Sequence, residues 1–342
     1  MAEASVRVSV DVGGTFTDVT LTDLASGRIA TAKVLTTPED RGIGVLVGIR
    51  NALEANQLDI ETVREVVHGS TTGTNALIER TGATVGFLTT EGFRDILEIG
   101  RVQRPMEGLY DISIDRPPPL VPRHRCLTAH ERIAADAGIL EPLDEGHVRD
   151  AAERFRELEV EAVAICFLSS YLSPVHEQRA AEILNAELPH CPISISSQLS
   201  PEYREYERAS TAVINAYLTP VMGDYLDSLE RRLAEEIGEV PLFVIQANGG
   251  STSVEKARAR AVTTVNSGPA GGVVAAAYYG RLHSRDKIVS VDMGGTSFDI
   301  GLIEDGVSKV TTEGEFQGLP VKIPIIDLHI IGAGGGSIAW ID

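Results

Sequence analysis

Alternating apolar and polar positions open the chain. Residues 6–12 and 17–22 alternate on either side of a Gly-Gly pair, which predicts a β-hairpin. A third strand is predicted at 28–35, and residues 39–56 have helical spacing despite three glycines. The segment "VREVVHGSTTGTNALIERTG" then runs from a strand through a turn into a helix. The beginning of the chain therefore predicts a sheet with helices packed against it.

The middle of the chain changes character twice. Residues 101–143 have little periodicity, and "RPMEGLYDISIDRPPPLVPRHR" holds five of the sixteen prolines, so we expect a loop-rich excursion. A helical pattern from Asp144 then precedes an apolar strand, "AVAICFL", which is followed by a helix at 174–188 and the strand "ISISS". Such a β-α-β succession favours a parallel pair of strands.

The remaining pattern is mostly helical until residue 283. The longest helical stretch covers 203–238 and contains Pro220, which we expect to break or kink the helix. "PLFVIQANGG" reads as a buried strand that ends in a glycine turn, and "SGPAGGVVAAAYYGRLH" as a helix of small residues. A final strand is predicted at 322–331, entering "GAGGGSIAWID".

Two short stretches repeat each other. "SVDVGGTFTDVTL" begins at Ser9, and "SVDMGGTSFDIGL" begins 281 positions later. In both copies a second aspartate follows the first by seven residues, Asp18 after Asp11 and Asp299 after Asp292. A lone Gly-Gly hairpin needs no explanation beyond turn geometry, but a duplicated register is improbable by chance. The repeat therefore indicates a function that needs both copies.

Each copy carries groups that suit a phosphate and a cation. Glycines allow positive φ and let a phosphate approach backbone N–H groups, and an aspartate at a strand end can hold Mg²⁺ through water. We predict a cleft in which both hairpins grip one triphosphate, with Asp11 and Asp292 as the catalytic and metal-holding carboxylates. The residues predicted to bind the nucleotide are Gly13, Gly14, Thr15, Thr17, Gly294, Gly295, Thr296 and Ser297.

Composition and the remaining motifs narrow the function classes. The net charge of −19 argues against nucleic acid or an anionic membrane as a partner, because both need clustered Lys and Arg. The sequence has neither a GxxxxGK[ST] loop nor a convincing GxGxxG after a first strand. We find no signal peptide and no apolar run long enough to span a membrane, so a cytoplasmic location is expected. The three isolated cysteines are predicted to be structural thiols.

The two D-x-G-G-T hairpins resemble the phosphate-1 and phosphate-2 motifs of the actin, sugar kinase and Hsp70 superfamily. More narrowly, the chain resembles the hydantoinase A and 5-oxoprolinase family. The matching segments are "DVGGTFTDV", "HGSTTGTNALIERTGA", "TTEGFRDILEIGR", "LYDI", "PLVPRHR", "HE" at 176–177, "REYERASTAVINAYLTP", "NSGPAGGV" and "DMGGTSFDIG".

This resemblance implies an α/β fold of the ribonuclease-H-like, duplicated type. It implies a hydantoinase/oxoprolinase N-terminal region at 1–200, and the start of a hydantoinase A core at 201–342. Members of the family are usually about twice as long, with the adenosine-binding glycine motif in the part that this sequence does not include. The resemblance therefore implies an incomplete second lobe.

The implied activity is ATP- and Mg²⁺-dependent hydrolysis of a cyclic amide such as a hydantoin or 5-oxoproline. The amide carbonyl would be activated by phosphorylation. An ATP-dependent ketone carboxylase subunit and a nucleotide-sensing module without turnover are the alternatives. The implied partner is a B-type hydantoinase subunit or the missing C-terminal half, in a hetero-oligomer.

Seven residues are predicted to line the substrate side of the cleft, each with a structural alternative. Hydroxyl groups near a helix N-terminus could bind an anion or simply cap the helix, and an arginine could bind a carboxylate or form a surface ion pair. An Asn-Gly-Gly turn after a buried strand is a common place for ligand contact. These residues are His68, Thr71, Thr72, Asn75, Arg101, Asn248 and Gly249.

Overall fold

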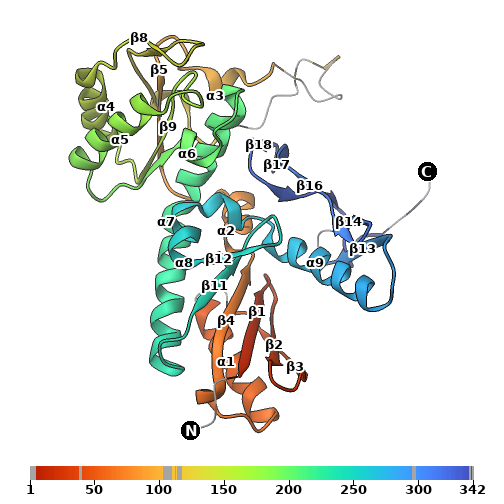
Figure 1. Cartoon of the computed structure of the whole chain (residues 1–342). Helices are drawn as coiled ribbons and strands as arrows, with labels where there is room; N and C mark the ends of the chain where they lie inside the picture. The colour runs from red at the N-terminus through yellow and green to blue at the C-terminus, as the bar shows by residue number, and fades with distance from the viewer. Residues whose placement is uncertain are drawn as a thin grey trace.

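A computed structural model describes residues 5–37, 41–102, 110–111, 113, 118–294, 298–338 and 340. Three groups of elements are visible in Figure 1: the first sheet, a second α/β unit around α4 and α5, and a last unit around β13 and β14. The long helix α7 (Glu205–Glu236) runs between the first two, and α9 (Ser267–Leu282) leads to the third. In the described part of the chain no helix has both the length and the apolar character needed to cross a bilayer.

The first sheet has six strands in the order β12-β11-β4-β1-β2-β3. β1 pairs antiparallel with β2 and parallel with β4, which confirms the first predicted hairpin. Helix α1 (Arg41–Ala55) covers one face, and a Cβ on Gly48 would lie only 2.7 Å from Val19, so this glycine permits close helix–sheet packing. The strands are β1 (Val6–Val12), β2 (Phe16–Asp23), β3 (Ile29–Leu35), β4 (Val63–Ser70), β11 (Leu242–Ile245) and β12 (Ser251–Ser253).

The second sheet is parallel throughout, in the order β10-β9-β5-β6. Both of its faces are covered, by α4 (Glu145–Glu157) and α5 (Val175–Glu187) on one side and by α7 on the other. The predicted β-α-β unit is confirmed, because β9 and β10 pair in parallel. The strands are β5 (Val85–Thr90), β6 (Cys126–Ala129), β9 (Ala162–Cys166) and β10 (Ile193–Ile195).

Two expectations about the middle of the chain need correction. Strand β6 lies inside the segment expected to be loop-rich, and with four residues it is too short to show a clear period. Helix α7 continues through Pro220 for 32 residues, so the expected break is wrong. Residues from most of its length, Leu218, Met222 and Leu229 among them, are buried, and this packing compensates for the hydrogen bond that proline cannot donate.

The last unit is built on the second hairpin. β13 (Ile288–Met293) and β14 (Phe298–Glu304) pair antiparallel, and β14 also pairs with β15 (Val307–Ser308) and β20 (Leu328–Ile331). The strand expected at 322–331 is instead divided. β19 (Ile325–Ile326) pairs with β16 (Val310–Thr311), whereas β20 pairs with β14, so the chain changes partner at Asp327.

Shorter elements connect these units. They are α2 (Thr72–Ile78), α3 (Ile96–Ile99), α6 (Ser196–Leu199), α8 (Val254–Ala259), the 3-10 turns Ile60–Thr62, Arg123–Arg125 and Ala261–Thr264, and the strands β7 (Arg132–Ile133), β8 (Ile139–Glu141), β17 (Gly314–Phe316) and β18 (Leu319–Val321).

A buried polar network ties the second sheet to α7. The Glu177 carboxylate is fully buried and accepts hydrogen bonds from the Phe167 N–H, the Ser170 and Ser196 hydroxyls and the Ser197 N–H. Arg208 of α7, also buried, donates to the same Ser170 hydroxyl and to the Phe167 carbonyl. The Ser170 hydroxyl thus links the buried Glu177 carboxylate to the buried Arg208 guanidinium. Buried charges are tolerated only when they are hydrogen-bonded or paired, and this network meets that requirement.

Replacing Glu177 with alanine is expected to lower the free energy of unfolding by about 3–5 kcal/mol, since it leaves the Arg208 charge and several donors buried without the acceptor. Urea unfolding monitored by circular dichroism measures the change. Glu182→Ala, whose side chain is 66% exposed in an ion pair with Arg179, is the control and should change stability by less than about 0.5 kcal/mol. Equal effects of the two variants would contradict the proposed role of the network.

The cysteines are expected to be unreactive in the folded chain. All three are buried, and burial raises the pKa of Cys126, Cys166 and Cys191 to about 11. The nucleophilic thiolate is therefore scarce at neutral pH. A chromogenic disulfide reagent should detect three thiols in denaturant and essentially none under native conditions. Rapid native labelling would show that one of them is accessible.

Candidate functional site

The two hairpins place their aspartates in the same way. Asp11 lies directly opposite Asp18 across β1 and β2, and Asp292 lies opposite Asp299 across β13 and β14. Asp292 is also close enough to Asp11 for its negative charge to raise the pKa of the Asp11 carboxyl group. The acidic ends of two hairpins that are 281 residues apart in sequence therefore lie near one another in space.

Asp11 stands at the centre of this arrangement. Its pKa is raised, first because surrounding protein removes water and then because Asp18 and Asp292 carry like charges, while Lys33 acts in the opposite direction. The residue nevertheless keeps substantial solvent exposure, so its carboxylate stays available to a ligand. Two glycines leave space beside it: a Cβ on Gly69 would lie 3.2 Å from Asp11 Oδ1, and one on Gly268 would lie 3.6 Å away.

The turn of the first hairpin is fixed by hydrogen bonds at Gly13 and is open at Gly14. The Gly13 N–H donates to the Phe16 carbonyl over 2.9 Å, and the Thr36 hydroxyl donates to the Gly13 carbonyl over 3.0 Å. Gly14 has open space around it, and within the described residues no hydrogen bond from the Gly14 or Thr15 N–H is present. The N–H groups of Gly14 and Thr15 could therefore donate hydrogen bonds to an anion.

Two details of that turn differ from expectation. Gly13 and Gly14 are not among the glycines with positive φ in the described part of the chain, so the value of Gly14 lies in the space it leaves rather than in its φ. Thr17 points into the core, fully buried, and its hydroxyl lies 3.0 Å from that of Thr36. Thr17 thus braces the turn from within, and its predicted contact with the nucleotide has no support in this geometry.

The second turn is described only in part. Gly294 accepts a hydrogen bond from the Gly335 N–H over 2.9 Å, so the glycine cluster at 332–337 lies against the end of β13. Gly295, Thr296 and Ser297, which we predict to bind phosphate, lie outside the described residues.

Strand β4 and helix α2 place the other predicted residues beside the first turn. Thr71 precedes α2 and bonds to the Val12 carbonyl through both its N–H and its hydroxyl, each over 3.1 Å. The Thr72 hydroxyl meets that of Ser70 at 2.7 Å, and the Asn75 amide donates to the Thr71 hydroxyl over 3.4 Å. These contacts join the start of α2 to the end of β1.

His68 occupies the core of the first sheet. It pairs in register with Val10 and Val244, is fully buried, and its Nε2 lies 2.8 Å from the Tyr225 hydroxyl. Burial lowers its pKa to about 4, so the ring is neutral at pH 7. The structure thus places His68 behind the site, where it would act on a substrate only through the strand that carries it.

The other three predicted residues lie at different places. Arg101 forms a bidentate ion pair with Glu207, consistent with the structural alternative. The Asn248 side chain accepts from the Gly250 N–H over 2.9 Å and so shapes its own turn. Gly249 has φ +79°, and a Cβ there would lie 2.5 Å from Val274 of α9 and 2.9 Å from Ile326, so only glycine fits.

The sequence reasoning missed the residues that join α9 to Asp11. Asn266 is left-handed at φ 56°, and its N–H donates a hydrogen bond to Thr74 Oγ1, while the Ser267 hydroxyl donates to the Ser70 carbonyl. Gly268, the second residue of α9, lies beside Asp11. The segment "NSGPAGGV" entered the prediction as part of a small-residue helix and as a family match, whereas its polar start, Asn266 and Ser267, was the available signal for this contact.

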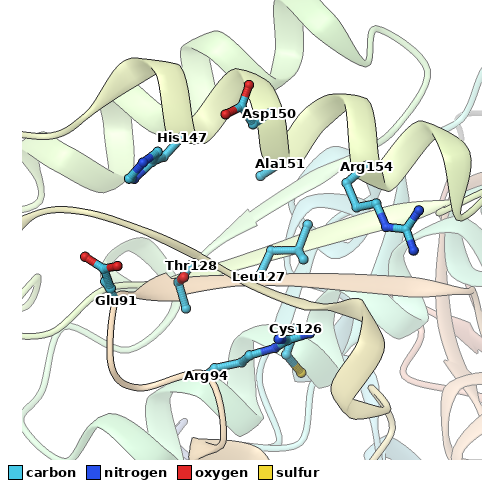
Figure 2. A pocket seen from close by; sticks show the side chains of 9 residues that line it. All are labelled: Glu91, Arg94, Cys126, Leu127, Thr128, His147, Asp150, Ala151 and Arg154. Atoms are coloured by element: carbon cyan, nitrogen blue, oxygen red, sulfur yellow. The ribbon is translucent and has the colours of Figure 1, made fainter.

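Two cavities can be compared with this site. One of about 90 Å³ adjoins Asn266, between the turn after β11 and the strands β16, β17, β19 and β20. A larger one, of about 340 Å³, lies in the second α/β unit. Figure 2 shows His147, Asp150 and Arg154 of α4 on one side of it and residues of β6 on the other. None of the predicted site residues lines the larger cavity.

The acidic pair fits a hydrated cation better than a protein-enclosed metal. Among the described residues no group of three or more His, Cys, Asp or Glu side chains could hold a metal ion. Mg²⁺ usually keeps several waters and uses one or two carboxylates together with substrate phosphates. Asp11 and Asp292 could provide such a pair, since Asp292 is near enough to contribute, after burial and Asp18, to the raised pKa of Asp11.

Comparison with known proteins gives close relatives along the whole chain. Caprolactamase subunit alpha of Pseudomonas jessenii is 38% identical over 347 residues, covering 100% of this chain and 50% of that protein. The 5-oxoprolinase of Saccharomyces cerevisiae is 30% identical, covering 99% of this chain and 29% of its own length. The chain thus spans half or less of the length of these relatives.

Solved structures agree with this. The crystal structure of the ATP-dependent caprolactamase from P. jessenii superposes with a TM-score of 0.89 at 39% identity, over 98% of this chain and 49% of that one. Nucleotide-free acetone carboxylase gives 0.87 at 27% identity, over 99% and 49%. These likenesses confirm the predicted α/β fold.

The family assignment follows from two matched regions. Residues 7–188 match the hydantoinase/oxoprolinase N-terminal region, and residues 208–342 match the hydantoinase/oxoprolinase domain. The chain therefore belongs to the hydantoinase/oxoprolinase family.

Proposed function

We propose that this chain is the phosphate-binding part of an ATP-dependent enzyme that hydrolyses a cyclic amide. The observation that carries the proposal is the pair of acidic hairpins, since Asp292 approaches Asp11 closely enough to raise its pKa. The names of the relatives support the substrate class, because caprolactam and 5-oxoproline are both cyclic amides.

The chemistry of an amide explains the need for ATP. Resonance makes the amide carbonyl a poor electrophile. Transfer of the γ-phosphoryl group to the carbonyl oxygen breaks the bond to ADP and turns that oxygen into a leaving group. Water then adds to the carbon and the ring C–N bond breaks, which leaves the ring nitrogen as an amine and the carbon as an acyl phosphate. A second water hydrolyses the acyl phosphate to the ring-opened acid and phosphate. Such catalysis consists mainly of positioning and charge stabilisation.

Different residues of this chain would bind the phosphates, the cation and the substrate. The N–H groups of Gly14 and Thr15 would bind phosphate oxygens in the first hairpin. In the second copy the corresponding sequence, Gly294 to Ser297, would do so. Asp11 and Asp292 would hold Mg²⁺ through water, and the ion would supply positive charge against the phosphates. Thr71 and Asn75 would border the substrate, as their place beside the first turn suggests.

An ATP-dependent ketone carboxylase is the second candidate. The structural likeness to acetone carboxylase favours it, and the same phosphorylation would activate an enol or bicarbonate. The higher identity to the caprolactamase supports the amide reading more strongly. A nucleotide-sensing module without turnover is the outcome if no substrate stimulates ATP hydrolysis.

We further propose that the chain works in a hetero-oligomer in the cytoplasm, with a B-type subunit or a polypeptide equivalent to the rest of its longer relatives. The word "subunit" in the name of the caprolactamase relative supports such an assembly. The division into functional regions at 1–200 and 201–342 is part of the same proposal.

The substrate class can be tested directly. ATP hydrolysis by the assembled enzyme should rise at least tenfold with one of caprolactam, hydantoin or 5-oxoproline, and the ring-opened acid should form in equal amount to the phosphate released. Coupled phosphate detection and mass spectrometry measure both. Stimulation only by ketone with bicarbonate would favour the carboxylase, and no stimulation by any substrate would contradict both enzymatic readings.

Asp11→Asn is expected to reduce Mg²⁺-dependent ATP turnover at least about 100-fold, because it removes a carboxylate from the cation site while keeping its size. Asp305→Asn, an exposed position in the turn after β14 with φ 54°, is a matched control that should keep full turnover. Circular dichroism should show both variants folded. Turnover of Asp11→Asn equal to that of the control would remove Asp11 from the site.

The pH dependence of Mg²⁺-ATP affinity should respond to the neighbours of Asp11. The carboxylate must be ionised to hold a cation, and its raised pKa means that affinity is lost at a higher pH than for an ordinary aspartate as the solution is acidified. Asp18→Asn removes a like charge and should move the acid limb to lower pH. Lys33→Met removes an opposing charge and should move it to higher pH.

A fluorescent nucleotide titrated over a pH series measures these shifts. Movement in the same direction for both variants would show that the charge at Asp11 does not control binding.

A further inference from the structure

The two copies of the hairpin differ in how their apolar faces are covered. When Asp11 is aligned with Asp292, three valines of β1 correspond to three apolar residues of β13, namely Val8, Val10 and Val12 to Val289, Val291 and Met293. In the first copy their exposed fractions are 0%, 3% and 0%, and in the second they are 60%, 61% and 61%. On the next strand Leu21 is 2% exposed, whereas its counterpart Leu302 is 55% exposed.

The covering elements of the first copy have no counterpart among the described residues of the second. Helix α1 packs over the valine face of β1 and β2, and β4 pairs in parallel with the other edge of β1. In the second copy α9 packs on the opposite face, through Val273 and Ile303. Within the described part of the chain β13 pairs with β14 alone, so one edge of β13 is free.

The exposed residues form one continuous surface. Val289 lies directly opposite Leu302, while Ile300 and Phe298 stand opposite Val291 and Met293. Neither a lysine nor a proline occurs in Ile288–Met293, although such residues commonly protect an edge strand from pairing with another chain. We call this surface, made of Val289, Val291, Met293 and Leu302, the open face.

We propose that the open face and the free edge of β13 are the docking site for a polypeptide equivalent to the half of the relatives that this chain does not cover. That polypeptide would add a strand parallel to β13, as β4 does to β1, and would lay an apolar helix over the open face, as α1 does over the valines. The length of the relatives supports this occupant. The superposition with the caprolactamase structure includes 98% of this chain but only 49% of that protein's chain.

The docking geometry also has a consequence for the site. Strand β4 ends at Gly69 and Ser70, beside Asp11. A strand added to β13 in the same register would end beside Asp292. The docked polypeptide would therefore bring its own turn to the acidic pair, in the position that Gly69 and Ser70 occupy in the first copy.

The test needs neither nucleotide nor substrate. The tagged 342-residue chain is co-expressed with the half of P. jessenii caprolactamase subunit alpha to which it does not align, and the two are purified on the tag. We expect a one-to-one complex by light scattering. Val291→Glu and Val289→Glu should each reduce co-purification at least tenfold, because they place a charge on the open face. Leu140→Glu, 67% exposed on β8, is the matched control and should have no effect.

Hydrogen exchange gives an independent reading that needs no variant. The amides of Ile288–Met293 that face the free edge should exchange at least tenfold more slowly in the complex than in the chain alone. Unfolding curves should show that both glutamate variants fold as the wild type does, since the replaced side chains are exposed.

Three results would overturn the proposal. The first is the absence of a complex, and the second is equal co-purification of Val291→Glu and the wild type. The third is a homodimer, at twice the 36.6 kDa mass, that Val291→Glu dissolves, which would show that a second copy of the chain occupies the open face. Failure of the ATPase measurements would leave all three results unchanged, so the two proposals can fail separately.

Discussion

The alternation of side chains along a β-strand is the constraint on which the site depends. Because neighbouring residues point to opposite faces, burying Val10 and Val12 beneath α1 forces Asp11 to the other face. There it meets Gly69, Gly268 and the second hairpin. The acid is therefore positioned by the hydrophobic effect acting on its two neighbours, and a slip of one residue in register would exchange core and site.

Space beside the carboxylate is secured by residues that lack side chains. Gly69 lies at the end of a parallel strand and Gly268 at the start of a helix, and both stand within van der Waals reach of Asp11. The surrounding threonines are occupied with one another and with backbone carbonyls, which holds the turn at Gly13 rigid while Gly14 remains open. Rigid support behind an open turn is what electrostatic stabilisation of a phosphate requires.

Much of this could be predicted from the sequence, for identifiable reasons. The hairpins were readable because alternation and a duplicated Asp spacing are local patterns. The β9-α5-β10 unit was readable because β9 is a continuous apolar run and β10 alternates apolar and polar residues. The helix break expected at Pro220 does not occur, because packing along α7 outweighs the tendency of proline to end a helix. His68 and Thr17 looked like ligands because polar residues near glycines suggest a site, whereas only tertiary contacts reveal that both face the core. The approach of Asn266 to Thr74 joins residues 192 positions apart, which no local pattern reports.

Helix α7 has a mechanical consequence. At about 1.5 Å per residue its 32 residues extend for about 48 Å, in contact with strands of the second sheet, with α1 and with α2. It therefore joins these two parts of the molecule along most of its length. The last unit is attached to these parts both by β18, which packs on α7, and by α9, whose first residues touch Asp11 and whose later ones support β13 and β14. Because α9 contacts Asp11 at its start and the second hairpin further along, a shift of this helix would change the separation of Asp11 and Asp292.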